Sequence, residues 1–178
     1  MAEPGRIDPQ RDALLRLLQE ADVAFVLVGG VAIESHGVRH RTDDVDVTPQ
    51  GTPENLERLA SALNGLDCKL VIDPSDSDQD IPLPVGYFTA ANLARQDVWN
   101  LRTTYGNLDI PFRPGGFPRG YEDLDRGAQS LLVAETSVTV RIAALKDIEH
   151  SKRTVARQKD VDYLNRVGRL QAPVAPAS

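Results

Sequence analysis

A short apolar run that ends in two glycines places the strongest constraint on this chain. Phe25-Val26-Leu27-Val28 has the length and composition of a buried strand, and Gly29-Gly30 follows it directly. Further on, Val45-Asp46-Val47-Thr48 alternates apolar and polar side chains before Pro49, as a second strand does. The intervening segment, 31–43, has room for a short helix over 31–36, which Gly37 would end. The sequence therefore predicts a sheet with helices beside it.

The rest of the chain supports a mixed α/β (α+β) fold. Helices are expected to begin at Asp8-Pro9 and Thr52-Pro53, because a capping side chain followed by proline is typical of a first turn. Gly106-Asn107 is expected to form the turn of a hairpin between strands 98–105 and 108–112. The remaining expectations are strands at 70–72, 131–133 and 138–140, a polar loop over 73–84, a helix over 121–128 and helices over 143–170 that break around Arg157-Gln158.

Length and composition limit the class of protein. A chain of 178 residues suits one domain. We expect a core over 1–142, C-terminal helices over 143–170 that complete the active site, and a disordered Pro- and Ala-rich tail over 171–178. No apolar run approaches the ~20 residues of a membrane helix, so no membrane association is expected. The acidic start lacks a secretion segment and Cys68 is the only cysteine, which favours a cytoplasmic protein without disulfides.

Charge is unevenly distributed along the sequence. The chain has 20 Lys and Arg against 26 Asp and Glu, a net charge of −6, and four aspartates lie between 73 and 80. From 141 to 169, however, eight basic residues stand against four acidic ones, a local surplus of +4. The acidic total argues against a protein that binds nucleic acid over its whole surface, but the C-terminal part remains compatible with a phosphate-bearing partner.

The pair Asp44 and Asp46 carries the clearest chemical signal. Side chains two residues apart on a strand point to the same face, so the two carboxylates should project together. Neighbouring carboxylates repel unless a positive charge lies between them, and Mg²⁺ binds one or two carboxylates together with phosphate oxygens. Gly29 and Gly30 would let backbone N–H groups approach a phosphate closely.

Asp109 is the best candidate for a third carboxylate. It stands among apolar residues on an expected strand, where an acid without a function is uncommon. The alternative is an aspartate held by backbone donors near a hairpin.

Several motifs in this order resemble a known superfamily. Gly29-Gly30 followed by 42–46, Thr-Asp-Asp-Val-Asp, is similar to the signature of polymerase-β-type minimal nucleotidyltransferases. The segments 105–110, 112–116 and 120–124, then Ser151-Lys152 and Lys159-Asp160, resemble the AbiEii/MenT-like nucleotidyltransferase toxins. The resemblance extends over about 25–167 and implies a nucleotidyltransferase-type mixed sheet flanked by helices, with a C-terminal helical segment.

The resemblance also implies a set of roles. Asp44, Asp46 and Asp109 would bind Mg²⁺, and Asp109 would either activate the acceptor or complete the metal site. Lys152 would neutralise the β- and γ-phosphates, and Asp160 would orient Lys152 or contact the nucleotide. The residues expected around the triphosphate or the acceptor phosphates are Gly29, Gly30, Thr42, Arg39 and Arg41. Val31 stands where the superfamily often has a serine, which leaves Thr42 as the candidate hydroxyl.

The function implied is transfer of NMP from an NTP to an acceptor hydroxyl, with release of pyrophosphate. The closest likeness suggests the toxin of a toxin–antitoxin pair that modifies the 3′ acceptor end of tRNA, with an antitoxin protein as partner. Two alternatives remain open at this point. One keeps the chemistry but transfers to a protein hydroxyl or a small molecule such as an antibiotic. The other is a non-catalytic binding module with the same fold.

Overall fold

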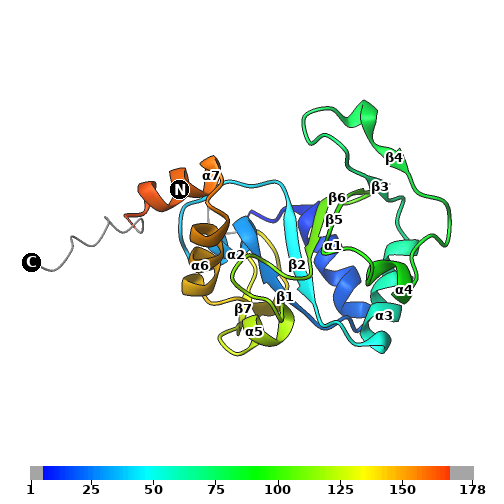
Figure 1. Cartoon of the computed structure of the whole chain (residues 1–178), viewed down its shortest axis with the longest axis horizontal. Helices are drawn as coiled ribbons and strands as arrows, with labels where there is room; N and C mark the ends of the chain where they lie inside the picture. The colour runs from blue at the N-terminus through cyan, green and yellow to red at the C-terminus, as the bar shows by residue number, and fades with distance from the viewer. Residues whose placement is uncertain (1–5, 169–178) are drawn as a thin grey trace, which may run out of the picture.

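The structure is a computed structural model, and it describes residues 6–168. Its centre is one mixed sheet in which the strands follow the order β4-β3-β5-β6-β2-β1-β8-β7 (Figure 1). Parallel pairing joins β1 to β8 and β2 to β6, and the other neighbours are antiparallel. The strands are β1 (Phe25–Val28), β2 (Val45–Pro49), β3 (Lys69–Leu70), β4 (Ile81–Pro82), β5 (Val98–Thr103), β6 (Gly106–Pro111), β7 (Gln129–Leu132) and β8 (Thr139–Ile142).

Helices cover the sheet on both sides. In Figure 1, α1, α3 and α4 lie toward one end of the molecule and α2, α6 and α7 toward the other. The helices are α1 (Pro9–Glu20), α2 (Gly29–Ser35), α3 (Pro53–Asn64), α4 (Ala90–Leu93), α5 (Tyr121–Asp125), α6 (Leu145–Val155) and α7 (Gln158–Arg166), with a 3₁₀ turn at η1 (Ser77–Gln79). The mixed α/β class expected from the sequence is confirmed.

The centre of the sheet is also the centre of the core. All four residues of β1 are buried, as expected for a strand with neighbours on both edges and helices on both faces. Leu14, Leu15 and Leu18 of α1 have no exposed surface, and Leu59 and Leu63 of α3 are equally buried. The apolar stripes of these two helices therefore anchor one side of the sheet.

Both helix starts expected from an Asx or Thr followed by proline are confirmed. The Asp8 side chain accepts hydrogen bonds from the backbone N–H groups of Gln10 and Arg11, which caps α1. The Thr52 hydroxyl accepts one from the N–H of Asn55, which caps α3. These contacts satisfy N–H groups that have no partner within the first turn.

The hairpin between β5 and β6 turns earlier than the sequence predicts. Thr103 pairs with Gly106, so Thr104 and Tyr105 form the two-residue turn, while Gly106 and Asn107 belong to β6. Gly106 takes a positive φ of 96°, and the Thr103 hydroxyl donates a hydrogen bond to its carbonyl. The expected turn at Gly106-Asn107 is therefore wrong, and Asn107 is a strand residue.

The segment between β3 and β5 is more structured than expected. The expected strand 70–72 is shorter and starts earlier, because β3 ends at Leu70. The polar loop 73–84 contains η1 and the short edge strand β4, and α4 follows at Ala90, where Thr89 forms a capping box with Asn92. We call residues 71–89 the excursion; its β4 end projects from the body of the molecule in Figure 1.

The last helices break close to the expected position. Ala156 adopts a left-handed conformation with φ 51°, and α7 begins at Gln158 with Arg157 at its N-cap. Elsewhere the elements differ from expectation by a few residues: α2 already starts at Gly29, α5 ends at Asp125, β7 spans Gln129–Leu132 and β8 spans Thr139–Ile142. The tail expected to be disordered, 171–178, lies outside the described residues.

No helix within residues 6–168 has both the length and the apolar character needed to cross a bilayer.

Candidate functional site

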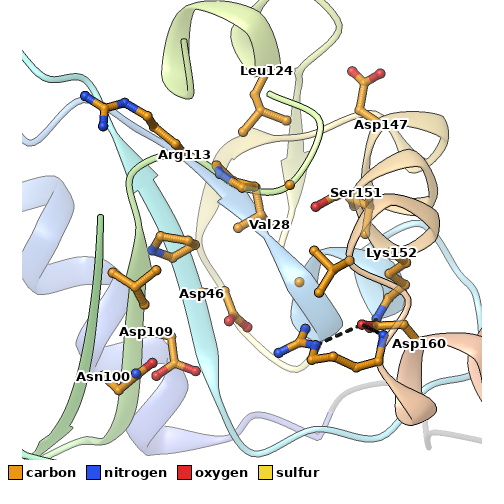
Figure 2. Close-up of a pocket in the computed structure, with 18 residues that line it drawn as sticks. Val28, Asp46, Asn100, Asp109, Arg113, Leu124, Asp147, Ser151, Lys152 and Asp160 are labelled. Carbon is orange, nitrogen blue, oxygen red and sulfur yellow. Dashed lines mark hydrogen bonds and ion pairs between the residues drawn. The ribbon is translucent and has the colours of Figure 1, made fainter. Parts of the chain in front are cut away.

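Two carboxylates meet on neighbouring strands at the centre of the sheet. Asp46 of β2 is in register with Asp109 of β6, and Asp109 in turn is opposite Asn100 of β5. The burial pattern of β6 alternates, with Leu108 and Ile110 buried on one face, so Asp109 lies on the other. We call the pocket-facing side chains Asp46, Asn100 and Asp109 the sheet wall, which Figure 2 shows on one side of the cavity.

Asp44 lies one step further along the same face. It directly precedes β2, two residues from Asp46, and its Oδ1 accepts a hydrogen bond of 2.9 Å from the amide of Asn107. Asn107 lies two residues from Asp109 on β6. Asp44 and Asn107 thus continue the polar face that Asp46 and Asp109 begin, although Asp44 is not among the residues that line the cavity.

Gly29 lets β2 come close to the start of α2. It has a positive φ of 70°, and a Cβ built on it would collide with the carboxylate of Asp46. Only glycine therefore fits between β1 and the Asp46 side chain. A Cβ on Gly30 would lie 2.6 Å from Cγ2 of Thr42, so the 36–44 loop packs against the second glycine.

The Thr42 hydroxyl binds a backbone group two residues further along the chain. Its Oγ1 accepts a hydrogen bond of 3.3 Å from the backbone N–H of Asp44, and its carbonyl accepts one of 3.1 Å from Arg11. Arg11 is buried and also binds Glu34 at 2.9 Å, which ties the loop before β2 to α1 and α2. Thr42 supports the position of Asp44 and does not line the cavity.

The opposite side of the cavity is built by α6 and α7. Asp160 has no exposed surface and accepts hydrogen bonds from Lys152 Nζ at 3.0 Å and from Arg157 Nε at 2.9 Å. Lys152 also lies over the ring of Tyr163, at 5.1 Å from its centroid. We call Ser151, Lys152, Arg157 and Asp160 the helical wall; Figure 2 shows Lys152 and Asp160 across the cavity from Asp46 and Asp109.

The glycines at 115 and 116 hold the two walls together. A Cβ on Gly115 would lie 2.5 Å from Val155 of α6, and one on Gly116, where φ is 84°, would lie 2.6 Å from His150. The loop after β6 therefore packs directly onto α6, which closes the site at that end.

The cavity between the walls has a volume of about 370 Å³. Beyond the polar residues of both walls it has an apolar side, formed by residues of β1, β5, the loop after β6, α5 and α6. The remaining lining residues are Val28, Gly29, Val98, Pro111, Arg113, Pro114, Gly115, Leu124, Asp147, Ile148 and Val155. This size suits a small organic ligand.

Negative charge on the sheet side is not balanced. Burial, and then the charges of Asp109 and Asp44, raise the pKa of Asp46 to about 8. Burial, and then the charge of Asp44, raise the pKa of Asp109 to about 6. Both shifts mean that the folded chain disfavours ionisation of these acids as it stands.

The pKa of Asp160 shifts in the opposite direction. Burial works against its ionisation, but hydrogen bonds from Arg157 and Lys152 outweigh that cost and lower its pKa. The helical wall thus holds an ionised carboxylate with two cations, and one positive charge remains in excess.

Further cations lie on the loop before β2 and on α7, outside the cavity lining. Arg39 and Arg41 are exposed on the loop before β2 and have no ion-pair partner within residues 6–168. His40, between them, contacts Arg166 of α7 at 3.0 Å, and its pKa is lowered by burial and then by the charges of Lys152, Arg166 and Lys159. The predicted phosphate-binding arginines therefore lie beside α7, but outside the cavity lining.

Within the described residues, no three His, Cys, Asp or Glu side chains form a ready metal-binding cluster. The donors near Asp46 are nevertheless of the kind that Mg²⁺ binds, since carboxylate oxygens converge from neighbouring strands. The raised pKa values of Asp46 and Asp109 show that burial and neighbouring carboxylates make their ionisation costly, and a bound cation would relieve that cost. The residues present therefore fit a divalent cation.

Sequence reasoning missed three polar contributors. Asn107 was assigned to a turn, Asn100 carried no motif, and Arg157 was placed only at a helix break. The available signal was the period of two in the strand around Asp109, which puts Asn107 on the same face. Asn100 and Arg157 depend on strand register and on the contact between α6 and α7, and neither of these can be derived from local spacing.

No protein-family model matches this chain, and no curated protein is significantly similar to it in sequence. At least one solved structure shares its fold. A provisionally assigned nucleotidyltransferase of Thermotoga maritima superposes with a TM-score of 0.55 at 12% identity, over 96% of this chain and 100% of that one. The antibiotic-resistance factor ANT(2'')-Ia superposes with a TM-score of 0.48 at 15% identity, over 93% of this chain and 75% of that one.

Proposed function

We propose that this chain, which has the nucleotidyltransferase fold, is a Mg²⁺-dependent nucleotidyltransferase. The observation that carries the proposal is the in-register pair Asp46 and Asp109, which faces Lys152 and Arg157 across a cavity of about 370 Å³. Carboxylates on one side and cations on the other suit a metal–triphosphate complex. The sequence resemblance to AbiEii/MenT-like toxins adds the finer expectation of a toxin.

The reaction transfers NMP to an acceptor hydroxyl. The acceptor oxygen forms a bond to the α-phosphorus of the NTP while the bond from that phosphorus to the β-phosphate oxygen breaks, and pyrophosphate leaves. Asp109 either takes the acceptor proton or completes the cation site; both roles need its carboxylate beside Asp46. A bound Mg²⁺ would be held by Asp46 with Asp44 and Asp109, and would supply charge neutralisation for the phosphates.

The helical wall offsets charge on the leaving group. Lys152 and Arg157 are both held by Asp160, so their positions are fixed before a ligand enters. Cations that are already in place stabilise the charge that develops on pyrophosphate without reorganisation. Asp160 thus orients the cations, which is one of the two roles expected for it from the resemblance.

The exposed cations on the loop before β2 and on α7 favour a polyanionic acceptor. Arg39, Arg41, Lys159 and Arg166 are exposed on two adjacent segments, although the chain as a whole carries a net charge of −6. Together these four cations would attract the phosphates of RNA and repel a cationic small molecule such as an aminoglycoside. We therefore propose the 3′ acceptor end of tRNA as the acceptor, and the toxin of a toxin–antitoxin pair as the biological role.

An acceptor screen tests this proposal. The protein is incubated with each of the four NTPs, labelled in the α-phosphate, together with Mg²⁺ and either bulk tRNA, tRNA-free cell protein or aminoglycosides. We expect label in tRNA, and we expect prior periodate oxidation of the 3′ terminal diol to prevent it. Label in protein alone would refute tRNA as the acceptor, and label in the antibiotic alone would make the chain a resistance enzyme.

The same screen is run with the double variant Asp44→Asn/Asp46→Asn as control. This variant should transfer no label and should not arrest growth when expressed. Growth arrest by the double variant equal to that of the wild type would favour a non-catalytic binding module. Absence of label from every acceptor with the wild type would overturn nucleotidyl transfer. A small co-transcribed gene directly upstream would support an antitoxin partner.

A further inference from the structure

A chain of polar contacts runs across the sheet from the excursion to Asp44. Asp80, at the end of η1, forms an ion pair with Arg102 of β5. Arg102 donates a hydrogen bond of 3.1 Å to Oδ1 of Asn107, and Asn107 Nδ2 donates one of 2.9 Å to Oδ1 of Asp44. Four side chains from four segments of the chain therefore form one connected series.

The chemistry of arginine fixes the direction of every bond in this series. A guanidinium only donates, so the Asn107 oxygen must face Arg102 and its NH₂ group must face Asp44. The reversed amide would place NH₂ against the guanidinium and an oxygen against a carboxylate. The amide of Asn107 is thereby locked in the orientation that holds Asp44.

Strand register explains why these residues meet. Arg102 is directly opposite Asn107 in the β5–β6 pair, as Asn100 is opposite Asp109. Trp99 and Leu101 of β5 are buried on the other face. The series therefore lies on the polar face that carries the sheet wall, one row from Asp109.

Stability alone does not account for Asp80. Its side chain is only 1% exposed, and its Oδ1 has no hydrogen-bond partner within the described residues. A buried oxygen without a partner costs about 1–3 kcal/mol, which is comparable to the gain from the charge-assisted bond between Arg102 and the other oxygen, so the pair adds little net stability. The use suggested by the geometry is to fix Arg102.

We propose that Arg102 and Asn107 are positioning residues that hold Asp44 ready for a divalent cation, with Asp80 as the anchor of Arg102. This inference rests on the proposed function, since it takes Asp44 as a cation ligand. Asn107 engages one oxygen of Asp44, which leaves the other available. Because a neutral amide stands between Arg102 and Asp44, the series fixes the position of Asp44 without pairing its negative charge directly with the guanidinium.

Metal binding to the nucleotide-free protein is the direct test. The affinity for Mn²⁺, used as a spectroscopic probe, is measured by electron paramagnetic resonance for the wild type, Asn107→Leu and Arg102→Lys. Leucine has a similar volume but no donor, and lysine cannot bind Asp80 and Asn107 at once. We expect the Mn²⁺ affinity to fall roughly tenfold in Asn107→Leu, as it does when partners of metal ligands are removed elsewhere. Arg102→Lys should show a smaller fall.

Arg141→Lys serves as the matched control. Arg141 of β8 also bridges two acceptors, the carboxylate and the carbonyl of Asp125, but it lies away from the sheet wall. This variant should bind Mn²⁺ as the wild type does. In transfer assays, Asn107→Leu should need more Mg²⁺ for half-maximal rate, while kcat at saturating Mg²⁺ stays close to that of the wild type.

The outcomes separate this inference from the proposed function. Unchanged Mn²⁺ affinity in both Asn107→Leu and Arg102→Lys would overturn the positioning role. A loss of kcat that excess Mg²⁺ does not restore, together with a lower melting temperature, would show a merely structural role and overturn it as well. A wild type that binds Mn²⁺ but transfers no nucleotide would refute the proposed function and leave the positioning role standing. A wild type that binds no Mn²⁺ would overturn the inference.

Discussion

The sheet wall and the helical wall face each other across one cavity but differ in how their charges are balanced. On the sheet wall, Asp46 and Asp109 have no cationic partner in direct contact among residues 6–168, and their pKa values are raised to about 8 and about 6. On the helical wall, Asp160 binds two cations and its pKa is lowered. The ionised form of aspartate is therefore disfavoured on the sheet wall and favoured on the helical wall.

The difference indicates that the sheet wall would gain more than the helical wall from binding a cation. The folded chain already provides the cations that ionised Asp160 needs, whereas full ionisation of Asp46 and Asp109 near neutral pH would need a cation from solution. The buried acids of the sheet wall lower the stability of the fold, as residues that form a binding site often do. Four predictions test this contrast.

The largest effect is expected for Asp46→Asn. Removing this carboxylate should lower kcat at least about 1,000-fold, because several kcal/mol of transition-state stabilisation depend on the cation it holds. The melting temperature of the metal-free protein at about pH 8 should rise by about 3 °C, since a buried repulsion disappears. Transfer assays and thermal denaturation measure the two effects. A lower melting temperature would contradict the imbalance described for this wall.

Gly29→Ala tests the close approach of β1 to Asp46. The new Cβ would collide with the Asp46 carboxylate, so transfer should fall about 10- to 100-fold through displacement of that side chain. Gly37→Ala is the matched control, because Gly37 has a similar φ of 80° but nothing within 4 Å of a new Cβ. Both variants should lose about 1 kcal/mol of stability from the positive φ. Equal activities in the two variants would refute the need for a glycine at 29.

Asp160→Asn tests the balanced wall. An amide cannot accept from Lys152 and Arg157 as a carboxylate does, so unfolding free energy should fall by about 2 kcal/mol, the loss typical of charge-assisted hydrogen bonds. That loss corresponds to a melting temperature roughly 6 °C lower in a chain of this length. Denaturant unfolding provides the measurement. A stability gain, as predicted for Asp46→Asn, would remove the contrast between the walls.

The smallest effect concerns pH. A carboxyl group with a raised pKa stabilises the folded chain at low pH, and that contribution is lost as pH rises from about 4 to about 8 for Asp46. The contribution of Asp160, with its lowered pKa, is present above its ordinary pKa and is lost as pH falls. The melting temperature gained on adding Mg²⁺ should therefore grow by a few degrees between about pH 6 and about pH 8. A gain that is independent of pH would contradict ionisation of Asp46 on metal binding.

Local patterns predicted much of the sheet side. The strand 25–28, the glycine pair and the alternation around Asp46 each depend on residues next to one another, and capping at Asp8 and Thr52 is equally local. The nucleotidyltransferase fold implied by the family resemblance is confirmed. That the acids bind a metal, and that the chain is a toxin, remain predictions.

Contacts between distant segments could not be predicted in the same way. Whether Asn107 lies in a turn or in a strand depends on which two residues close the hairpin, and a shift of one residue moves its side chain to the opposite face. The helical wall depends on how α6 and α7 meet around Ala156, whose left-handed conformation is unusual for a residue other than glycine. Spacing along the chain contains no information on how α6 and α7 meet.

The order of the two walls along the chain has a consequence during synthesis. Asp46 and Asp109 leave the ribosome well before Lys152 and Asp160, and Gly115 and Gly116 can lock onto α6 only once that helix has emerged. A nascent polypeptide therefore cannot bring the sheet wall and the helical wall together until α6 and α7 have both emerged.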